Sequence, residues 1–228
     1  MGVEFTPVAV DDDASLAIRV SIAAALAYRG ASRMTQQRLV LASASPRRKA
    51  LLTQLGLEFE VVVTDTDEAV KPGELPAQLV VRLASAKARA GHQHGSITLG
   101  ADTIVAIGDE ILGKPRGQTE GMAMLRRLSG RVHEVHTGVA AFDGARIEVA
   151  VVTTRVFFRE ISELEVDNYW RTGEPADKAG GYGIQGVGGI FAYRIEGSYS
   201  AVVGLPLAQT EQLLRAFNCD IWSMQTNG

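Results

Sequence analysis

Apolar runs and alternating segments separate stretches of helical periodicity along most of this chain. A continuous apolar run is typical of a buried strand, and alternation of apolar and polar residues is typical of a half-buried one. These patterns predict strands over the following ranges: 39–42, 59–63, 97–107, 132–142, 146–158 and 189–195. Apolar residues at helical spacing predict helices over these ranges: 46–55, 78–90, 118–128, 161–171 and 206–217. The dipeptide Asp143-Gly144 predicts a hairpin between the two long strands.

The segment 39–56 joins one of these strands to a helix. Ser45 is a favourable N-cap, and Pro46 suits the first helical position because its missing N–H is not needed there. Leucines at helical spacing follow, and Gly56 is a typical helix stop. The junction therefore predicts a helix that begins at Pro46.

The first turn of that helix carries an unexpected cluster of cations, including Arg47 and Arg48. Cations are mildly unfavourable at the positive end of the helix dipole. Free backbone N–H groups, the hydroxyls of Ser43 and Ser45 and two guanidiniums would converge there, and that arrangement suits a phosphate or polyphosphate. The alternative is a surface helix with solvated arginines, since the segment lacks the glycines and the Lys-Ser/Thr pair of a Walker loop.

Two carboxylates stand out further along the chain. Glu68 closes an acidic segment, 64–68, at the end of a predicted strand, where α/β proteins place metal ligands. A solvated loop is the alternative. Asp102 interrupts the most apolar strand, and a buried carboxylate is costly unless it is paired or bound to metal. The alternative for Asp102 is a capping role at a bulge beside Gly100.

Two lysines and a glycine-rich loop add candidate binding groups. Lys87 lies on a predicted helix, and Lys114 lies in a predicted turn. The loop 174–189 contains a formal dinucleotide-binding fingerprint, but no helix pattern follows it, so we reject that interpretation. We expect the glycines there to let the backbone approach a ligand closely. The loop would present three polar side chains: Asp177, Lys178 and Gln185.

Composition limits the alternatives. The 228 residues suit one large domain or two small ones, and a net charge of -3 argues against an electrostatic nucleic-acid binder. The single cysteine, Cys219, excludes an internal disulfide framework and fits the reducing cytoplasm. We find no apolar run of the roughly 18–20 residues that a membrane helix needs. His133 and His136 lie three apart on a strand, so they should face opposite sides and not share a zinc ion.

Residues 1–36 differ from the remainder of the chain. An alanine-rich segment, 14–28, predicts a helix, but three aspartates precede it where a signal peptide would be basic. Met34 is a possible alternative start. We expect 1–36 to be an appendage outside the catalytic fold, with an interaction helix as the less favoured interpretation. The expected domain spans 37–220, and a tail spans 221–228.

Seven ordered motifs over about residues 38 to 217 resemble the Maf family of nucleoside triphosphate pyrophosphatases. The motifs are SASPRR from Ser43, RLA-x-x-KA from Arg82, GADT from Gly100, LGKP from Leu112, LSG from Leu128, DKAG-x-YGIQG from Asp177, and GSY followed by VGLPL from Gly197. Seven motifs in order are far more specific than any one alone. The 36 residues that precede them are the main departure from the family.

The resemblance implies an α/β fold: a curved mixed β-sheet flanked by helices, with a central cleft between two lobes. It implies hydrolysis of a nucleoside triphosphate to the monophosphate and pyrophosphate with a divalent cation, Mg²⁺ or Mn²⁺. Asp102 matches the proton acceptor, and the specificity positions are Arg47, Thr103 and Gln185. That combination resembles the branch acting on dTTP and UTP. We also expect a homodimer.

The chemistry of the individual residues, considered without the resemblance, agrees with this reaction. Arg48, Lys87 and Lys114 can neutralise charge on phosphate oxygens, and Glu68 and Asp102 offer oxygen ligands to the cation. Whether Asp102 acts mainly as base or as metal ligand stays open. The alternatives are a pyrophosphatase of other base preference and a nucleotide-binding regulator of cell division.

Overall fold

The computed structural model describes residues 38–222, and within them seven strands form one mixed sheet. The strands are β1 (Arg38–Ala42), β2 (Glu60–Val61), β3 (Ser96–Ile107), β4 (Glu110–Leu112), β5 (Val132–Phe142), β6 (Ile147–Phe158) and β7 (Ala192–Glu196). Their order is β2-β1-β3-β5-β6-β7, with β4 paired to β3. β1 is parallel to β2 and β3, whereas the remaining pairs are antiparallel. The predicted α/β fold with a mixed sheet is confirmed.

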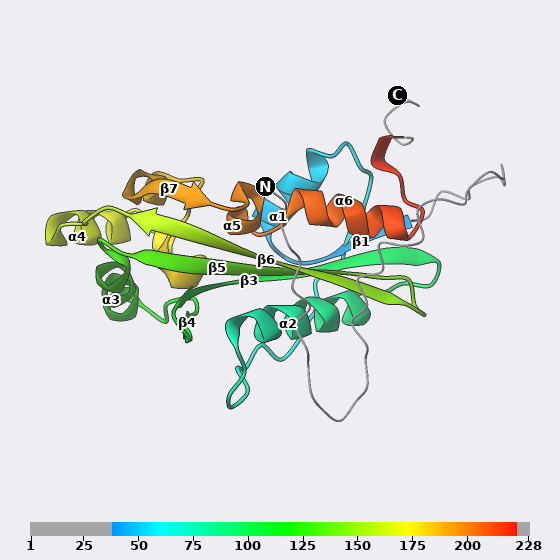
Figure 1. Ribbon diagram of the computed structural model, residues 1–228, viewed down its shortest axis with the longest axis horizontal. Coiled ribbons are helices and arrows are strands. Elements are labelled where there is room, and N and C mark those ends of the chain that lie inside the picture. The colour runs from blue at the N-terminus through cyan, green and yellow to red at the C-terminus, as the bar shows by residue number, and fades with distance from the viewer. Residues whose placement is uncertain (1–37, 223–228) are drawn as a thin grey trace. The chain divides into compact units, whose positions relative to one another are not determined.

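Helices cover both faces of this sheet (Figure 1). The α-helices are α1 (Pro46–Thr53), α2 (Pro76–Ala90), α3 (Gln118–Leu128), α4 (Glu163–Arg171), α5 (Tyr199–Val203) and α6 (Leu207–Ala216). Three 3₁₀ helices follow α4: η2 (Glu174–Asp177), η3 (Ala179–Gly181) and η4 (Val187–Phe191). α2 lies on one face, and α1, α5 and α6 lie on the other (Figure 1). In the described part of the chain, no helix is long and apolar enough to cross a membrane.

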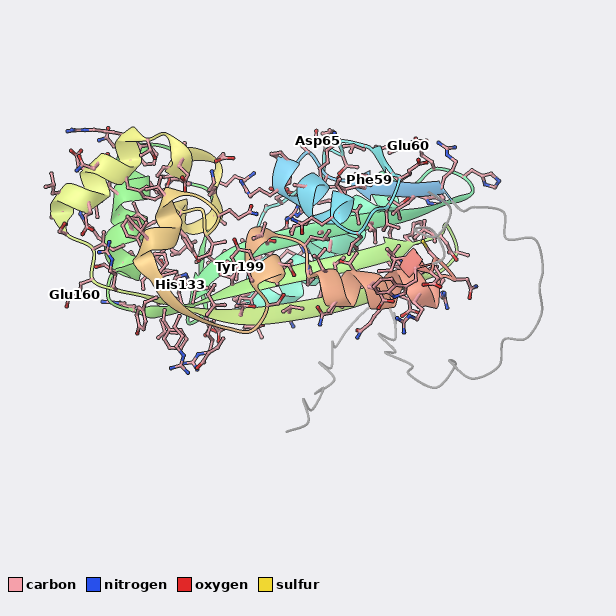
Figure 2. All side chains as sticks on the ribbon, turned by 90° about the horizontal axis from the view of Figure 1, so that it is seen from above. Phe59, Glu60, Asp65, His133, Glu160 and Tyr199 are labelled. Carbon is pink, nitrogen blue, oxygen red and sulfur yellow. The ribbon has the colours of Figure 1, made fainter. Side chains whose placement is uncertain are left out.

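The two largest apolar clusters lie on different parts of the sheet. The first packs leucines of α1 and α6 against β1 and β3, with Leu41, Leu52 and Leu214 fully buried. The second packs α3, α4 and the 3₁₀ segments against the far ends of β5 and β6, around Phe158 and Phe191. Figure 2 shows Phe59 and Asp65 beside the first region and Glu160 at the opposite end of the view. Segments far apart in the sequence thus build two regions on one sheet.

Two predicted strands differ from the structure. The strand predicted over 59–63 is reduced to β2, which pairs only with Val40 and Leu41 at the edge of the sheet, and Val63 is 70% exposed. The segment predicted as a strand over 189–195 begins instead as η4 and becomes β7 only at Ala192. The predictions for residues 1–36 and for most of the tail lie outside the described residues.

Candidate active site

The candidate site lies where β3 has a neighbour on one side only. β1 pairs with residues 96–100 of β3, and β4 pairs with residues 105–107. Between them, among residues 38–222, residues 101–104 pair only with β5. Asp102 and Thr103 lie in this gap. Successive residues of a strand face opposite sides, so their side chains enter different surroundings.

Asp102 faces α2 and contacts Lys87. The Lys87 Nζ donates to Asp102 Oδ1 at 2.7 Å and to Glu68 Oε1 at 2.5 Å. Lys87 is 8% exposed and Asp102 is 7% exposed. Burial pushes the pKa of Glu68 upward, but the hydrogen bond from Lys87 and the charges of Lys87, Lys114 and Arg48 hold it below its ordinary value. Lys87 therefore stabilises the charged form of the Glu68 carboxylate.

Two glycines bring α2 close enough for this contact. A Cβ at Gly100 would lie 2.2 Å from the Ala84 carbonyl oxygen, and one at Gly138 would lie 2.4 Å from the Val80 carbonyl oxygen. Gly138 is paired with Asp102 across β3 and β5. Any side chain at these positions would push the helix away from the sheet. The glycines therefore determine the distance between α2 and the sheet, and with it the contact between Lys87 and Asp102.

Thr103 faces the other side of the sheet and contacts Arg48 of α1. The Arg48 guanidinium donates to the Thr103 hydroxyl at 3.3 Å, to Ser43 Oγ at 3.2 Å and to the Gly204 carbonyl oxygen at 2.8 Å. Burial lowers the pKa of Arg48, whereas the nearby Asp102 carboxylate opposes that shift. The predicted N-cap is confirmed, because Ser45 Oγ accepts from the Arg48 N–H at 3.4 Å. The junction thus holds one arginine in a fixed position.

Groups from the second region face this junction. Arg47 of α1 lies 3.6 Å from Asp177 of η2 as an ion pair. Lys178 donates to Asp177 at 2.7 Å and to the Glu174 carbonyl oxygen at 2.7 Å. The hydrogen bond from Lys178 lowers the pKa of Asp177, with its burial acting in the opposite direction. The structure therefore connects Arg47 of α1 to Asp177 and Lys178 of the glycine-rich loop through ion pairs.

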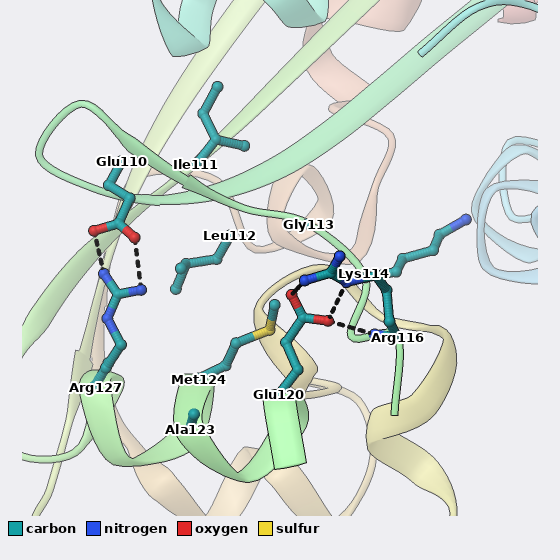
Figure 3. Close-up of a pocket in the computed structure, with 10 residues that line it drawn as sticks. All are labelled: Glu110, Ile111, Leu112, Gly113, Lys114, Arg116, Glu120, Ala123, Met124 and Arg127. Atoms are coloured by element: carbon teal, nitrogen blue, oxygen red, sulfur yellow. Dashed lines mark hydrogen bonds and ion pairs between the residues drawn. The ribbon is translucent and has the colours of Figure 1, made fainter. Parts of the chain in front are cut away.

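Gln185 and Lys114 are exposed. Gln185 lies in a turn between η3 and η4, and Lys114 lies two residues after the end of β4. A cavity of about 240 Å³ lies between β4 and α3 and is lined by Lys114, Met124 and Arg127 among others (Figure 3). Of the predicted site residues, only Lys114 lines it. The Lys114 side chain extends away from α3 (Figure 3), and its charge contributes to the lowered pKa of Glu68. This cavity is therefore separate from the Asp102 site.

Sequence reasoning missed three residues beside the site. Thr137 donates to the Ala201 carbonyl oxygen at 2.7 Å and lies 3.0 Å from the Thr103 hydroxyl oxygen. A buried threonine in the apolar strand 132–142 was the available signal, by the same reasoning that singled out Asp102. The other two, Glu174 and Tyr169, form a hydrogen bond that no sequence spacing marks.

The donor set fits a hard divalent cation. Glu68 and Asp102 are carboxylates that share one ammonium, so the site already accommodates a positive charge between them. Mg²⁺ takes oxygen ligands and commonly uses one or two carboxylates together with substrate phosphates. Within residues 38–222, no group of three or more His, Cys, Asp or Glu side chains could hold a metal ion. Substrate oxygens or water would therefore complete the coordination. His133 bonds to Tyr182 and His136 to Thr153, so the histidines do not converge.

Comparison with known proteins identifies relatives over most of the chain. The family model described as Maf-like protein matches residues 38–217. A protein of Hahella chejuensis is 52% identical over 193 residues, which cover 82% of this chain and 96% of that protein. A protein of Vibrio cholerae is 51% identical over 187 residues, covering 81% of this chain and all of that protein (100%). One of Saccharophagus degradans is 50% identical over 190 residues, covering 81% and 90%. Each of these three is named dTTP/UTP pyrophosphatase.

Proposed function

This chain belongs to the Maf family, and we propose from that premise that it hydrolyses dTTP and UTP to the monophosphate and pyrophosphate. The observation that carries the proposal is the cluster at the gap in β3, where Asp102, Lys87 and Glu68 lie on one face and Arg48 and Thr103 on the other. The names of the relatives support the substrate assignment.

The roles of the residues follow from where charge develops. Water attack at the α-phosphorus spreads negative charge over the phosphate oxygens and the leaving pyrophosphate. Arg48, Lys87 and Lys114 supply positive charge for those oxygens. The hydroxyl of Ser43 and free N–H groups at the start of α1 supply further donors. Asp102 accepts the proton of the attacking water, and its contact with Lys87 holds the carboxylate in place.

A divalent cation, Mg²⁺ or Mn²⁺, would be held by Glu68 and Asp102. When bound, it would neutralise phosphate charge and help to position the polyphosphate. Lys87 lies between the same two carboxylates and bears a positive charge, so it keeps them together before substrate arrives. Asp177 pairs with Arg47 on one side and with Lys178 on the other. We expect all three side chains to bind the substrate.

The pyrimidine preference rests on Gln185. A uracil or thymine ring offers two carbonyl acceptors beside one N–H donor. The amide NH2 of Gln185 can donate to a ring carbonyl oxygen while the amide oxygen accepts from the ring N–H. Cytosine presents an amino group and an unprotonated nitrogen, which would leave an amide that is held in the uracil-pairing orientation mispaired. Sites that pair polar groups reject such analogues strongly. Arg47 and Thr103 are the other two proposed specificity residues. The alternatives are another base preference or a nucleotide-binding regulator of cell division.

The test is a pyrophosphate-release assay over a panel of nucleoside triphosphates with Mg²⁺ and with Mn²⁺. We expect dTTP and UTP well ahead of CTP and the purine triphosphates. Gln185→Glu keeps an acceptor and loses the donor, so it should impair dTTP hydrolysis, whereas Gln118→Glu, at an exposed position of α3, should not. GTP or 7-methyl-GTP as the best substrate would overturn the base assignment, and no release from any nucleotide would favour the regulator.

Two further expectations accompany the enzymatic proposal. The single cysteine favours a reducing compartment, so we expect the protein to act in the cytoplasm. We also expect a homodimer, which light scattering on the purified protein would test. The net charge of -3 gives no electrostatic footprint for nucleic acid, so we expect no such partner.

A further inference from the structure

We propose that Glu174 is a positioning residue that holds the turn carrying Gln185, so that discrimination between pyrimidine bases depends on it. The inference rests on the proposed function, because it assigns the support for the base-reading side chain. Glu174 begins η2 and lies eleven positions before Gln185 in the sequence.

The Glu174 carboxylate accepts hydrogen bonds on both of its oxygens. Oε1 accepts from the Tyr169 hydroxyl at 2.7 Å and from the Gly188 N–H at 3.1 Å. Oε2 accepts from the Val187 N–H at 2.9 Å. These two N–H groups lie just after the turn. A carboxylate with three donors is a strong anchor, because hydrogen bonds to a charged acceptor are stronger than neutral ones.

The side of the turn before Gln185 is attached to the same anchor through Tyr169. The Tyr169 hydroxyl accepts from the Gly183 N–H at 3.0 Å while it donates to Glu174. Tyr169 is 2% exposed and packs edge-on against Phe191, so its position is fixed by the second core. The Gly186 N–H closes the turn onto the Gly183 carbonyl oxygen at 3.2 Å. Gln185 therefore lies between two anchored ends.

The glycines of this loop make room for the anchor. A Cβ at Gly186 would lie 2.3 Å from Glu174 Oε2, and one at Gly188 would lie 2.4 Å from the Tyr169 hydroxyl. The sequence analysis attributed these glycines to close approach of a ligand. The structure shows that at Gly186 and Gly188 the close neighbours are Glu174 and Tyr169. The glycine-rich loop is thus built around a charged side chain of the protein.

The charge state of Glu174 favours this role at neutral pH. Burial raises the pKa of Glu174, but the hydrogen bonds from Tyr169, Gly188 and Val187 outweigh it and hold the pKa below its ordinary value. The group is therefore an ionised acceptor under assay conditions. An amide in its place would turn one oxygen into a donor that meets another donor, so the anchor would lose at least one bond.

The experiment compares Glu174→Gln with Glu163→Gln, an exposed glutamate of α4 that pairs with Arg126. In Glu174→Gln we expect the KM for UTP to rise about 10-fold, the amount expected from one lost charged hydrogen bond, with kcat within about 2-fold. The preference for UTP over CTP should fall. Tyr169→Phe removes only the hydroxyl and should shift KM in the same direction. The control should match the wild type.

Two readouts separate positioning from a general structural effect. Amide hydrogen exchange should accelerate in Glu174→Gln at residues 183–188 and stay unchanged in the β-sheet. In a Gln185→Ala background, Glu174→Gln should not reduce the UTP preference further. Unchanged exchange at 183–188, or a fall in kcat with the base preference intact, would overturn the inference. A wild-type protein that prefers another base would overturn the proposed function instead, and hydrogen exchange would still decide the role of Glu174.

Discussion

The ammonium nitrogen of Lys87 lies 2.7 Å from Oδ1 of Asp102, and both side chains are buried. The same ammonium also contacts Glu68 at 2.5 Å. Removal of one partner from a buried ion pair leaves the other charge uncompensated, which is costly. Here Glu68 provides a second partner, so Lys87 keeps a counter-charge when Asp102 is neutralised. The chemistry of Asp102 can therefore be tested without loss of the fold.

Asp102→Asn should retain the fold and lose at least about 100-fold in turnover, the low end of general-base contributions. The amide is nearly the same shape, but it neither accepts a proton from water nor carries charge. The measurement is pyrophosphate release from UTP, with thermal unfolding to confirm folding. Asp109→Asn, in the exposed turn after β3, is the matched control and should be active. Turnover near that of the wild type in Asp102→Asn would rule out this assignment.

Arg48→Lys should raise the KM and destabilise the protein by about 2 kcal/mol. The guanidinium reaches Ser43, Thr103 and Gly204 with separate nitrogens, whereas a lysine has a single nitrogen that cannot reach all three. Steady-state kinetics and urea unfolding measure the two effects. Arg38→Lys changes an exposed arginine paired with Glu60 and should alter neither. Equal behaviour of the two variants would contradict the role given to Arg48.

Gly138→Ala should lower both stability and activity. The new methyl group would meet the Val80 carbonyl oxygen, so α2 must move outward, at a cost of about 1–3 kcal/mol as for other overpacked positions. Lys87 would move with the helix and lose its contact with Asp102. Gly117→Ala is the control, since a Cβ there has no neighbour within 4 Å. Full activity of Gly138→Ala would show that the site tolerates a displaced helix.

The stability of the protein should fall as pH decreases from about 6.5 toward 4, and His133 is one cause. Burial lowers the pKa of His133 to about 4, so the unfolded state binds a proton in this window that the folded state does not. The contribution is complete above the unfolded pKa of about 6.5 and declines by up to about 3 kcal/mol on acidification. Urea unfolding at several pH values measures it.

His133→Gln removes the titrating group and keeps a polar partner for Tyr182, so the dependence of stability on pH should become weaker in that window. The comparison uses slopes and not absolute stabilities, because the substitution itself changes packing. His94→Gln, on the exposed surface, is the matched control. An identical slope in wild type and His133→Gln would refute the assignment.

Deletion of residues 1–33 should leave the rate of pyrophosphate release nearly unchanged. Every proposed site residue lies between Ser43 and Gln185, and the family match begins at residue 38. Kinetics of the truncated protein test this, with circular dichroism to establish that it folds. A folded but inactive truncated protein would place the N-terminal segment in the site or in a required interface.

Local signals predicted much of the fold. Ser45 and Pro46 marked the start of α1 because capping depends on the residues of the turn itself. Asp143-Gly144 marked the hairpin, and the apolar run 97–107 marked β3. The strand predicted over 59–63 failed because pairing at a sheet edge is decided by neighbours and not by propensity. The strand predicted over 189–195 was wrong at its first residues, because they belong to η4, whose start is held by Glu174.

The same distinction between local and distant signals applies to the candidate site. Asp102 was found because a charge in an apolar strand needs a partner, and Lys87 is that partner. Glu174 was missed because its role depends on N–H groups more than ten residues away, which no periodicity marks. Thr137 acts through a contact across two strands and a helix. Sequence patterns thus identified the charged residues and left most of their supports undetected.

Gly100 also determines which alignment of β3 the sheet can accept. The Ala84 carbonyl oxygen leaves no space for a Cβ opposite that position, and only glycine fits. A slip of β3 by one residue would place Leu99 or Ala101 there, and it would also exchange the sides on which Asp102 and Thr103 emerge. The misaligned sheet would therefore clash with α2 at this position. The missing side chain at Gly100 therefore helps to determine both the alignment of β3 and the side of the sheet on which Asp102 lies.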